Sequence, residues 1–361
     1  MELISPLTAV REVEPLVEAG ATELYAGMLT RRWKDSFSTF VSNNDRDSVV
    51  GNFSDLEELR EAVDRAHELK VPVHLTLNPA YYTAAQADHL ARLMDDAVDA
   101  GVDGFLISDL PTMVRARREH PDISVHVSTI SPAFNSAALA FFAGLGAERA
   151  ILPQHLTPDE IVDLARDPPL DLEVFVLNDR CVNVDGFCTF MDGLQEAEGP
   201  RSGGLGRTIL HSRAALMAAR HVPRRLLRMA RRLPGLRPEP CLLDYGTEPV
   251  TVGAVSLECI AAARSRMEKH FHAKTGIDCG ACVLRTLMNA GVKAVKIAGR
   301  SNDTRRKLQD VHFIADLLRL AADDSIGDEE LYTHTQKTFR EGYSGSCRDE
   351  VCYYRTFLPR A

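Results

Sequence analysis

Short apolar segments alternate with amphipathic segments along most of this chain. The apolar segment at 71–78, for example, is preceded by a stretch at 54–70 whose apolar residues recur at helical spacing. Short apolar strands separated by helices predict parallel pairing through crossover helices. The predicted strands cover residues 2–7, 21–27, 71–78, 102–109, 123–129, 147–153, 172–178 and 293–299.

Eight such units predict a (β/α)8 TIM-barrel-like fold, in which the C-terminal ends of the strands and the loops after them build the site. An open, doubly wound sheet is the alternative, but no glycine-rich phosphate-binding fingerprint follows the first strand. Residues 195 to 240 interrupt the alternation, so we expect a long excursion between the seventh and the eighth strand.

Composition limits the class of protein. The chain has 361 residues with 45% hydrophobic content, enough for a large buried core. No apolar run reaches the roughly 20 residues that a membrane span needs. The N-terminus shows no positively charged region ahead of an apolar stretch, so we expect no secretory signal and a cytoplasmic location.

The charge is distributed unevenly. The net charge is −9, but residues 201–237 contain ten arginines and no lysine or acidic residue, which leaves 32 basic against 51 acidic residues, or −19, elsewhere. An acidic remainder disfavours a nucleic-acid partner. We interpret the arginine-rich segment either as a lid helix with solvated arginines or as a cover that holds one anionic partner.

Cysteines carry most of the candidate chemistry. Cys181, Cys188, Cys241 and Cys279 lie at the edges of strand-like or helical runs, where a barrel presents loops from one face. Disulfides seldom persist in the cytoplasm, so metal binding is the leading explanation. Four thiolates from separate loops suit an iron–sulfur cluster, with a closed zinc site as the alternative. Cys259, inside a helix-like run, is interpreted as a buried apolar side chain.

Three further cysteines leave their roles open. Cys282 forms a C-x-x-C pair with Cys279, so it could replace that residue as a ligand or take part in redox exchange. Cys347 and Cys352 near the C-terminus are interpreted either as a metal-binding or mutually paired couple, or as surface thiols in a loose tail.

Four blocks of sequence carry a family resemblance. They are NFSDLEELREAVDRAHELKVPVHLTLN at 52–78, HVST at 126–129, CVNVDGFC at 181–188 and KIAGR at 296–300. In order and spacing they resemble the collagenase-like peptidase family, peptidase U-32, over about residues 2–300. Within that family the chain is most similar to the UbiU/UbiV-type proteins of oxygen-independent hydroxylation.

The resemblance implies a [4Fe–4S] cluster rather than proteolysis. The family's cluster ligands fall on Cys181, Cys188, Cys241 and Cys279, although the family's Arg-Gly-x-Cys context is missing around Cys241. Some members are associated with prephenate as the source of the oxygen. The RNA-modifying members usually keep a second cysteine shortly after the third and an additional C-terminal domain. This chain has no such cysteine and a tail of about sixty residues.

Polar residues at the predicted strand ends complete the candidate site. His126 is our candidate for proton transfer. Arg300 is a candidate for holding a carboxylate through two hydrogen bonds. The other candidate substrate-binding residues are Tyr25, Asn78, Ser128 and Asn178.

Three classes of function remain open. The first is a cluster-dependent hydroxylase or oxygen-transfer enzyme that acts on a small, anionic organic substrate. The second is a U-32-type peptidase, although the chain contains neither G-x-S-x-G nor H-E-x-x-H. The third is a noncatalytic iron–sulfur subunit that pairs with a related chain. RNA-base hydroxylation is a further alternative, and the chain could also form a homo-oligomer.

These interpretations divide the chain into four regions. Residues 1–195 carry barrel strands one to seven. Residues 196–240 form a basic loop and helix insertion, and residues 241–320 hold the cluster-ligand region and the last barrel unit. Residues 321–361 form a short C-terminal extension.

Overall fold

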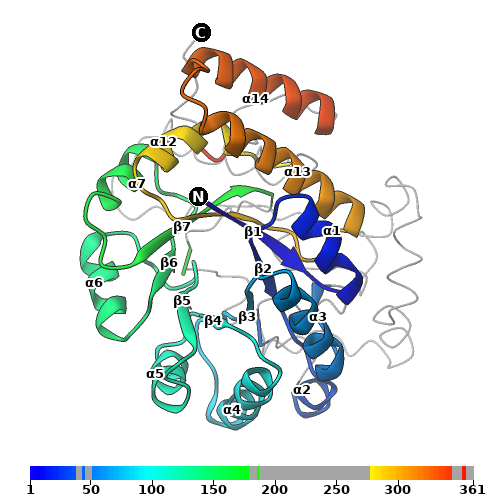
Figure 1. Cartoon of the computed structure of the whole chain (residues 1–361). Helices are drawn as coiled ribbons and strands as arrows, with labels where there is room; N and C mark the ends of the chain where they lie inside the picture. The colour runs from blue at the N-terminus through cyan, green and yellow to red at the C-terminus, as the bar shows by residue number, and fades with distance from the viewer. Residues whose placement is uncertain (38–42, 45–50, 179–184, 187–276, 344–351, 355–361) are drawn as a thin grey trace, which may run out of the picture.

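Eight parallel strands close into a barrel in this computed structural model, which describes residues 1–37, 43–44, 51–178, 185–186, 277–343 and 352–354. Each strand pairs with its neighbours in chain order, and β8 closes the ring against β1. Figure 1 shows helices around the outside of this ring. The TIM-barrel-like prediction is therefore confirmed. The strands are β1 (Glu2–Leu7), β2 (Glu23–Ala26), β3 (Val73–Leu77), β4 (Gly104–Ile107), β5 (Ser124–Val127), β6 (Arg149–Ile151), β7 (Asp171–Leu177) and β8 (Ala294–Ile297).

Alternate residues of each strand face two different layers. Outward-facing side chains such as Leu75, Phe105 and Val127 belong to the large apolar core between the strands and the helices. A separate, small apolar cluster of Ile4, Tyr25 and Ala294 forms from the other face of its strands. Many of the remaining inward positions carry polar or charged side chains, so the outer layer supplies most of the hydrophobic stabilisation.

Short polar residues begin most of the helices. Thr83 and Thr157 form capping boxes with Gln86 and Glu160, and Asp109 accepts the backbone N–H three residues further on. None of the helices in the described part of the chain combines the length and hydropathy that crossing a bilayer requires. The helices are α1 (Val13–Glu18), α2 (Arg31–Ser36), α3 (Leu56–Glu68), α4 (Ala84–Asp99), α5 (Leu110–Glu119), α6 (Ser136–Gly144), α7 (Pro158–Leu164), α12 (Leu284–Asn289), α13 (Thr304–Ala321) and α14 (Asp328–Tyr343).

The long excursion between β7 and β8 lies mostly outside the described residues. The predicted basic insertion at 196–240 falls there entirely. Of the segment between the two strands, the structure describes residues 185–186 and then the chain from residue 277 onward. Asp185 is tied to the barrel, because its carboxylate accepts the backbone N–H of Gln154 at 2.6 Å.

The C-terminal extension contains a helix that the sequence analysis did not anticipate. α14 packs outside α13, on the side away from the barrel (Figure 1). Phe339 and Tyr343 of α14 contact the ring of Phe313, at centroid distances of 6.1 and 5.2 Å. The Tyr343 hydroxyl also donates to Asp310 at 3.0 Å. Aromatic packing therefore makes residues 328–343 part of the folded domain.

Candidate functional site

Arg300 connects several segments at the C-terminal rim of the barrel. It follows β8, and its guanidinium is buried. Nη1 donates to Thr76 Oγ1 at 2.8 Å and to Asn52 Oδ1 at 3.4 Å, while Nη2 donates to the Asn44 carbonyl at 2.8 Å. The blocks at 52–78 and 296–300, which carry the family resemblance, therefore meet at this guanidinium.

Gly27 is required for this arrangement. A Cβ atom at Gly27 would lie 1.8 Å from Arg300 Nη1 and 2.3 Å from Asn52 Oδ1. No side chain fits at such distances unless the guanidinium moves. The structure thus gives Arg300 a positioning role at the rim, because both of its terminal nitrogens already donate to protein oxygens.

Asn178 joins the end of β7 to α13. Its backbone adopts a left-handed conformation with φ of 65°. The side-chain amide donates to Asp310 Oδ2 at 2.7 Å and to the Ala298 carbonyl at 3.2 Å, and its oxygen accepts from Arg306 at 2.8 Å. These contacts use both hydrogens of the side-chain amide and its oxygen. Asn178 therefore bonds the end of β7 to α13 and to the residue after β8.

Asn78, Ser108 and Ser128 follow three neighbouring strands, each directly after its last residue. Leu77 pairs with Ile107 and Ile107 with Val127, which places these three polar residues side by side at the rim. Asn78 Oδ1 and Ser108 Oγ are buried and have no hydrogen-bond partner. A buried polar atom without a partner is costly unless a ligand or water satisfies it. The row is therefore suited to binding a polar ligand.

Tyr25 lies deeper in the barrel than this row. Its hydroxyl donates to the Ile297 carbonyl at 3.1 Å, and the Lys296 ammonium lies 4.2 Å from the centre of its ring. Both contacts anchor the ring between β2 and β8. Of the five predicted substrate-binding residues, Asn78 and Ser128 thus lie in the rim row, whereas Tyr25, Asn178 and Arg300 hold parts of the barrel together.

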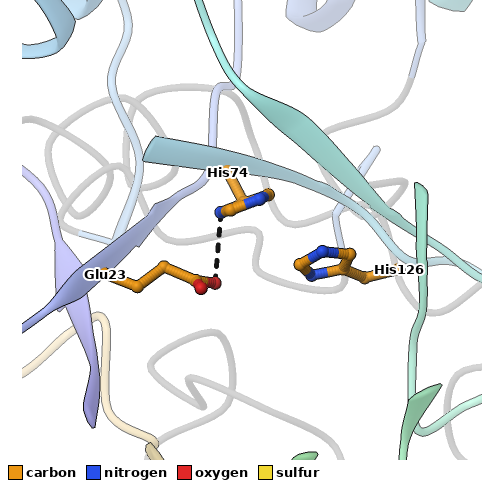
Figure 2. Close-up of side chains that lie close together, drawn as sticks. All are labelled: Glu23, His74 and His126. Carbon is orange, nitrogen blue, oxygen red and sulfur yellow. Dashed lines mark ion pairs between the residues drawn. The ribbon is translucent and has the colours of Figure 1, made fainter. Parts of the chain in front are cut away.

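A network of ionisable side chains fills the N-terminal half of the barrel. Arg149 Nη1 lies 2.8 Å from Glu23 and 3.3 Å from Glu173, and Lys296 Nζ lies 2.8 Å from Glu173. Figure 2 shows that His74 reaches toward Glu23, with Nδ1 3.1 Å from Oε1. His126 stacks on His74 at a ring distance of 4.4 Å. Sequence analysis missed this network, although the charged residues inside apolar strands were its visible signal.

Burial and neighbouring charges together set the pKa values in this network. Burial alone would raise the pKa of Glu23, but the adjacent His74 and Arg149 lower it to about 2. Burial lowers the pKa of His126 well below its ordinary value, and His74, Arg149 and Lys296 lower it further. His126 is therefore a neutral imidazole near pH 7, and it lies within β5 rather than at the barrel mouth.

Glu23, His74 and His126 could in principle hold a metal ion. One ligand atom from each lies within 4.8 Å of the others, and two histidines with a carboxylate are a common ligand set for transition metals. However, Arg149 and Lys296 lie beside the same carboxylates. The positive charges of Arg149 and Lys296, which add to burial in keeping a proton off His126, also oppose a divalent cation. We therefore interpret the ion pairs among Glu23, Glu173, Arg149 and Lys296 as links between the barrel strands.

Cys279 is the one predicted metal ligand within the described residues. It is buried, and it forms an antiparallel bridge with Leu177 at the end of β7. The backbone N–H of Ala281 donates to its sulfur at 3.5 Å, a contact that tunes metal-bound thiolates. Cys181, Cys188 and Cys241 lie outside the described residues. The setting of Cys279 fits a thiolate donor to a metal centre.

Comparisons with known proteins show which family this chain belongs to. Residues 8–213 match the model of peptidase family U32. The chain belongs to this family. Among curated relatives, the tRNA hydroxylation protein P of Haemophilus influenzae is 26% identical over 203 residues, which cover 56% of this chain and 41% of the relative. The tRNA hydroxylation protein P2 of Bacillus subtilis is 25% identical over 181 residues, covering 50% of this chain and 53% of the relative.

This chain spans about half the length of these curated relatives or less. Their names concern tRNA, and they weigh against our expectation that nucleic acid is disfavoured as a partner. A solved U32 peptidase, Mk0906, aligns with a TM-score of 0.39 at 15% identity, over 49% of this chain and 68% of the solved one.

Proposed function

We propose that this U32 protein holds a [4Fe–4S] cluster and acts in oxygen-independent hydroxylation. The observation that carries the proposal is the bridge between Leu177 and Cys279. The end of β7, which Cys181 and Cys188 follow in the sequence, therefore lies beside Cys279. The resemblance assigns the remaining thiolate to Cys241. A cluster of this kind supplies one-electron chemistry when it is bound.

The rim row is the proposed binding site for the polar part of the substrate. Asn78 Oδ1 is an acceptor, and the Ser108 hydroxyl can donate or accept. Ser128 lies next to Ser108 in the same row. Tyr25, Asn178 and Arg300 act as positioning residues that fix the strand ends around it. His126 keeps a candidate role in proton movement, because its ring lies below Ser128 on the same face of β5.

Hydroxylation inserts an oxygen atom into a C–H bond of the acceptor and so oxidises it by two electrons. These two electrons must be taken up either by the oxygen donor itself or, when the donated oxygen is an alcohol oxygen at the oxidation level of water, by an external two-electron oxidant. Prephenate is the donor we propose to test, and the acceptor is a small, anionic organic molecule. Zinc in the same thiolate site is the alternative cofactor.

RNA-base hydroxylation is the second candidate function, and the names of the curated relatives favour it. A flipped-out base presents hydrogen-bonding edges that a row of amide and hydroxyl groups can read. The acidic character of the chain outside residues 201–237 argues for a small acceptor instead. Four further points stay predictions. They are pairing with a related partner chain, formation of a homo-oligomer, a cytoplasmic location, and a role as a noncatalytic iron–sulfur subunit.

The test is an anaerobic assay of the full chain with prephenate, a chemical two-electron oxidant and two classes of molecule to be hydroxylated, unmodified tRNA and small organic anions. We expect hydroxylated product with wild type and none with Cys279→Ala. Undiminished turnover in a folded His126→Ala variant would remove His126 from the mechanism. Robust peptide hydrolysis by protein that contains no iron would contradict the proposal and favour the peptidase.

A further inference from the structure

Cys352 lies beside Cys279, although 73 positions separate them in the sequence. The two residues form a parallel bridge, and the backbone N–H of Tyr353 donates to the Cys279 carbonyl at 3.0 Å. Paired residues on neighbouring strands project from the same face of the sheet. The two cysteine side chains therefore leave the backbone on one side of this bridge.

Both cysteines are buried, at 9% and 8% exposure. This finding corrects the interpretation of Cys352 as a surface thiol in a loose tail. A buried cysteine on its own is usually a small apolar side chain. Here the neighbour is the one described residue to which the family resemblance assigns a metal, and its sulfur already accepts a backbone hydrogen bond.

Two tyrosines hold the segment 352–354 in place. The Tyr353 hydroxyl donates to the Asn178 carbonyl, and the Tyr354 hydroxyl donates to the Phe175 carbonyl at 3.3 Å. Both acceptors belong to the end of β7 or the residue after it. A Cβ atom at Gly280 would lie 2.7 Å from the Tyr354 ring, so glycine allows the close approach. These contacts fix Cys352 against the same strand end that leads toward Cys181.

We propose that Cys352 supplies a thiolate to the same metal centre as Cys279. This inference rests on the proposed function and replaces one of its four cluster ligands, Cys241, with Cys352. A [4Fe–4S] cluster takes four cysteine thiolates. If Cys279 and Cys352 provide two, the pair Cys181 and Cys188 provides the rest, and Cys241 is not needed. Cys241 is also the position that lacks the family's sequence context.

The experiment compares full-length wild type with five single variants, all purified anaerobically. They are Cys352→Ala, Cys352→Ser, Cys279→Ala, Cys241→Ala and the control Cys259→Ala. Iron and acid-labile sulfide per chain, visible absorption and far-UV circular dichroism are measured for each. We expect Cys241→Ala and Cys259→Ala to keep the wild-type iron content. We expect Cys279→Ala and both Cys352 variants to lose at least half of it.

The serine variant preserves the size of the side chain, so it separates loss of sulfur from loss of packing. Reduced iron in Cys352→Ser with a native dichroism spectrum supports the inference. Wild-type iron in either folded Cys352 variant, with iron lost from Cys279→Ala, overturns the inference and leaves the proposed function standing. Loss of iron from Cys241→Ala with full iron in Cys352→Ser restores Cys241 as the ligand. Wild-type protein without iron overturns the proposed function itself.

Discussion

The two halves of the barrel interior differ in the kind of polar group they contain. The N-terminal half holds charged groups that neutralise one another, with Arg149 between Glu23 and Glu173. The C-terminal rim holds the Arg300 guanidinium, which donates to protein oxygens, and a row of neutral groups in which Asn78 and Ser108 keep buried atoms without a partner. A buried charge is costly once its partner is removed, whereas a buried neutral group without a partner at the rim is available to a ligand. The comparison separates the part that holds the barrel together from the part that we expect to bind substrate.

The largest effect should come from breaking the charged half. Arg149→Met leaves Glu23 and Glu173 without their shared cation in a buried site. Removing one partner of a buried ion pair typically costs about 3–5 kcal/mol, so we expect a loss of that size in the free energy of unfolding, measured by urea denaturation. Arg166→Met is the matched control, because its pair with Asp163 is exposed, and it should change stability by less than about 1 kcal/mol. Equal losses in the free energy of unfolding for the two substitutions would show that the buried network stabilises the fold no more than an exposed ion pair does.

Gly27→Ala tests the rim framework. The new methyl group would collide with Arg300, whose nitrogens are held by Thr76, Asn52 and Asn44. Overpacking of this kind costs about 1–3 kcal/mol. Gly144→Ala is the control, since nothing lies within 4 Å of its Cβ position; it should stabilise the protein by up to about 1 kcal/mol. A Gly27→Ala variant as stable as wild type would show that Arg300 is not fixed at the rim.

The pH dependence of stability reports on His126. Its folded pKa is depressed, so the unfolded chain binds a proton below about pH 6.5 and the folded protein does not. The free energy of unfolding should therefore fall with decreasing pH below that value, by about 1.4 kcal/mol per pH unit for this group. His126→Gln should lack this contribution between pH 6 and pH 5. Glu23 acts in a different window: its folded pKa is about 2, so the stability it provides is lost only below about pH 4.5.

An unchanged slope in His126→Gln would mean that another group titrates. His74, Arg149 and Lys296 face the His126 ring, so their charges are part of the effect. Urea denaturation at each pH, with both proteins measured side by side, gives the comparison.

The smallest expected effect concerns ligand binding at the rim. Ser108→Ala removes a buried hydroxyl without a partner, so stability should stay the same or rise slightly. If the hydroxyl binds substrate, the loss of one hydrogen bond of about 0.5–1.5 kcal/mol should raise KM by about 2–10-fold. The steady-state assay with the active acceptor measures this change. An unaltered KM would take Ser108 out of the proposed site.

Local pattern was enough to predict the barrel. Seven of the eight strands lie within the predicted ranges, and β7 begins one residue earlier, at Asp171, because apolar runs bounded by helices are visible one segment at a time. α14 was missed, since its role depends on aromatic contacts with α13 that no periodicity within residues 328–343 reveals.

The site was predictable only in part, because many of its contacts join residues that are far apart in the sequence. Motifs at 52–78 and 296–300 meet at Arg300, but the sequence could not show that its guanidinium is already bonded to protein oxygens. The pairing of Glu23 with Arg149 joins residues 126 positions apart, and Cys352 reaches Cys279 from the far end of the chain. Such contacts are fixed by barrel closure rather than by local propensity.

The central claim is that this U32 protein carries an iron–sulfur cluster. The most direct measurement is the iron, sulfide and zinc content of anaerobically purified full-length protein, together with its Mössbauer spectrum after growth on 57Fe. We expect about four iron and about four sulfide per chain, with the spectrum of a [4Fe–4S] centre. Colourless protein with one zinc per chain and no iron would contradict it.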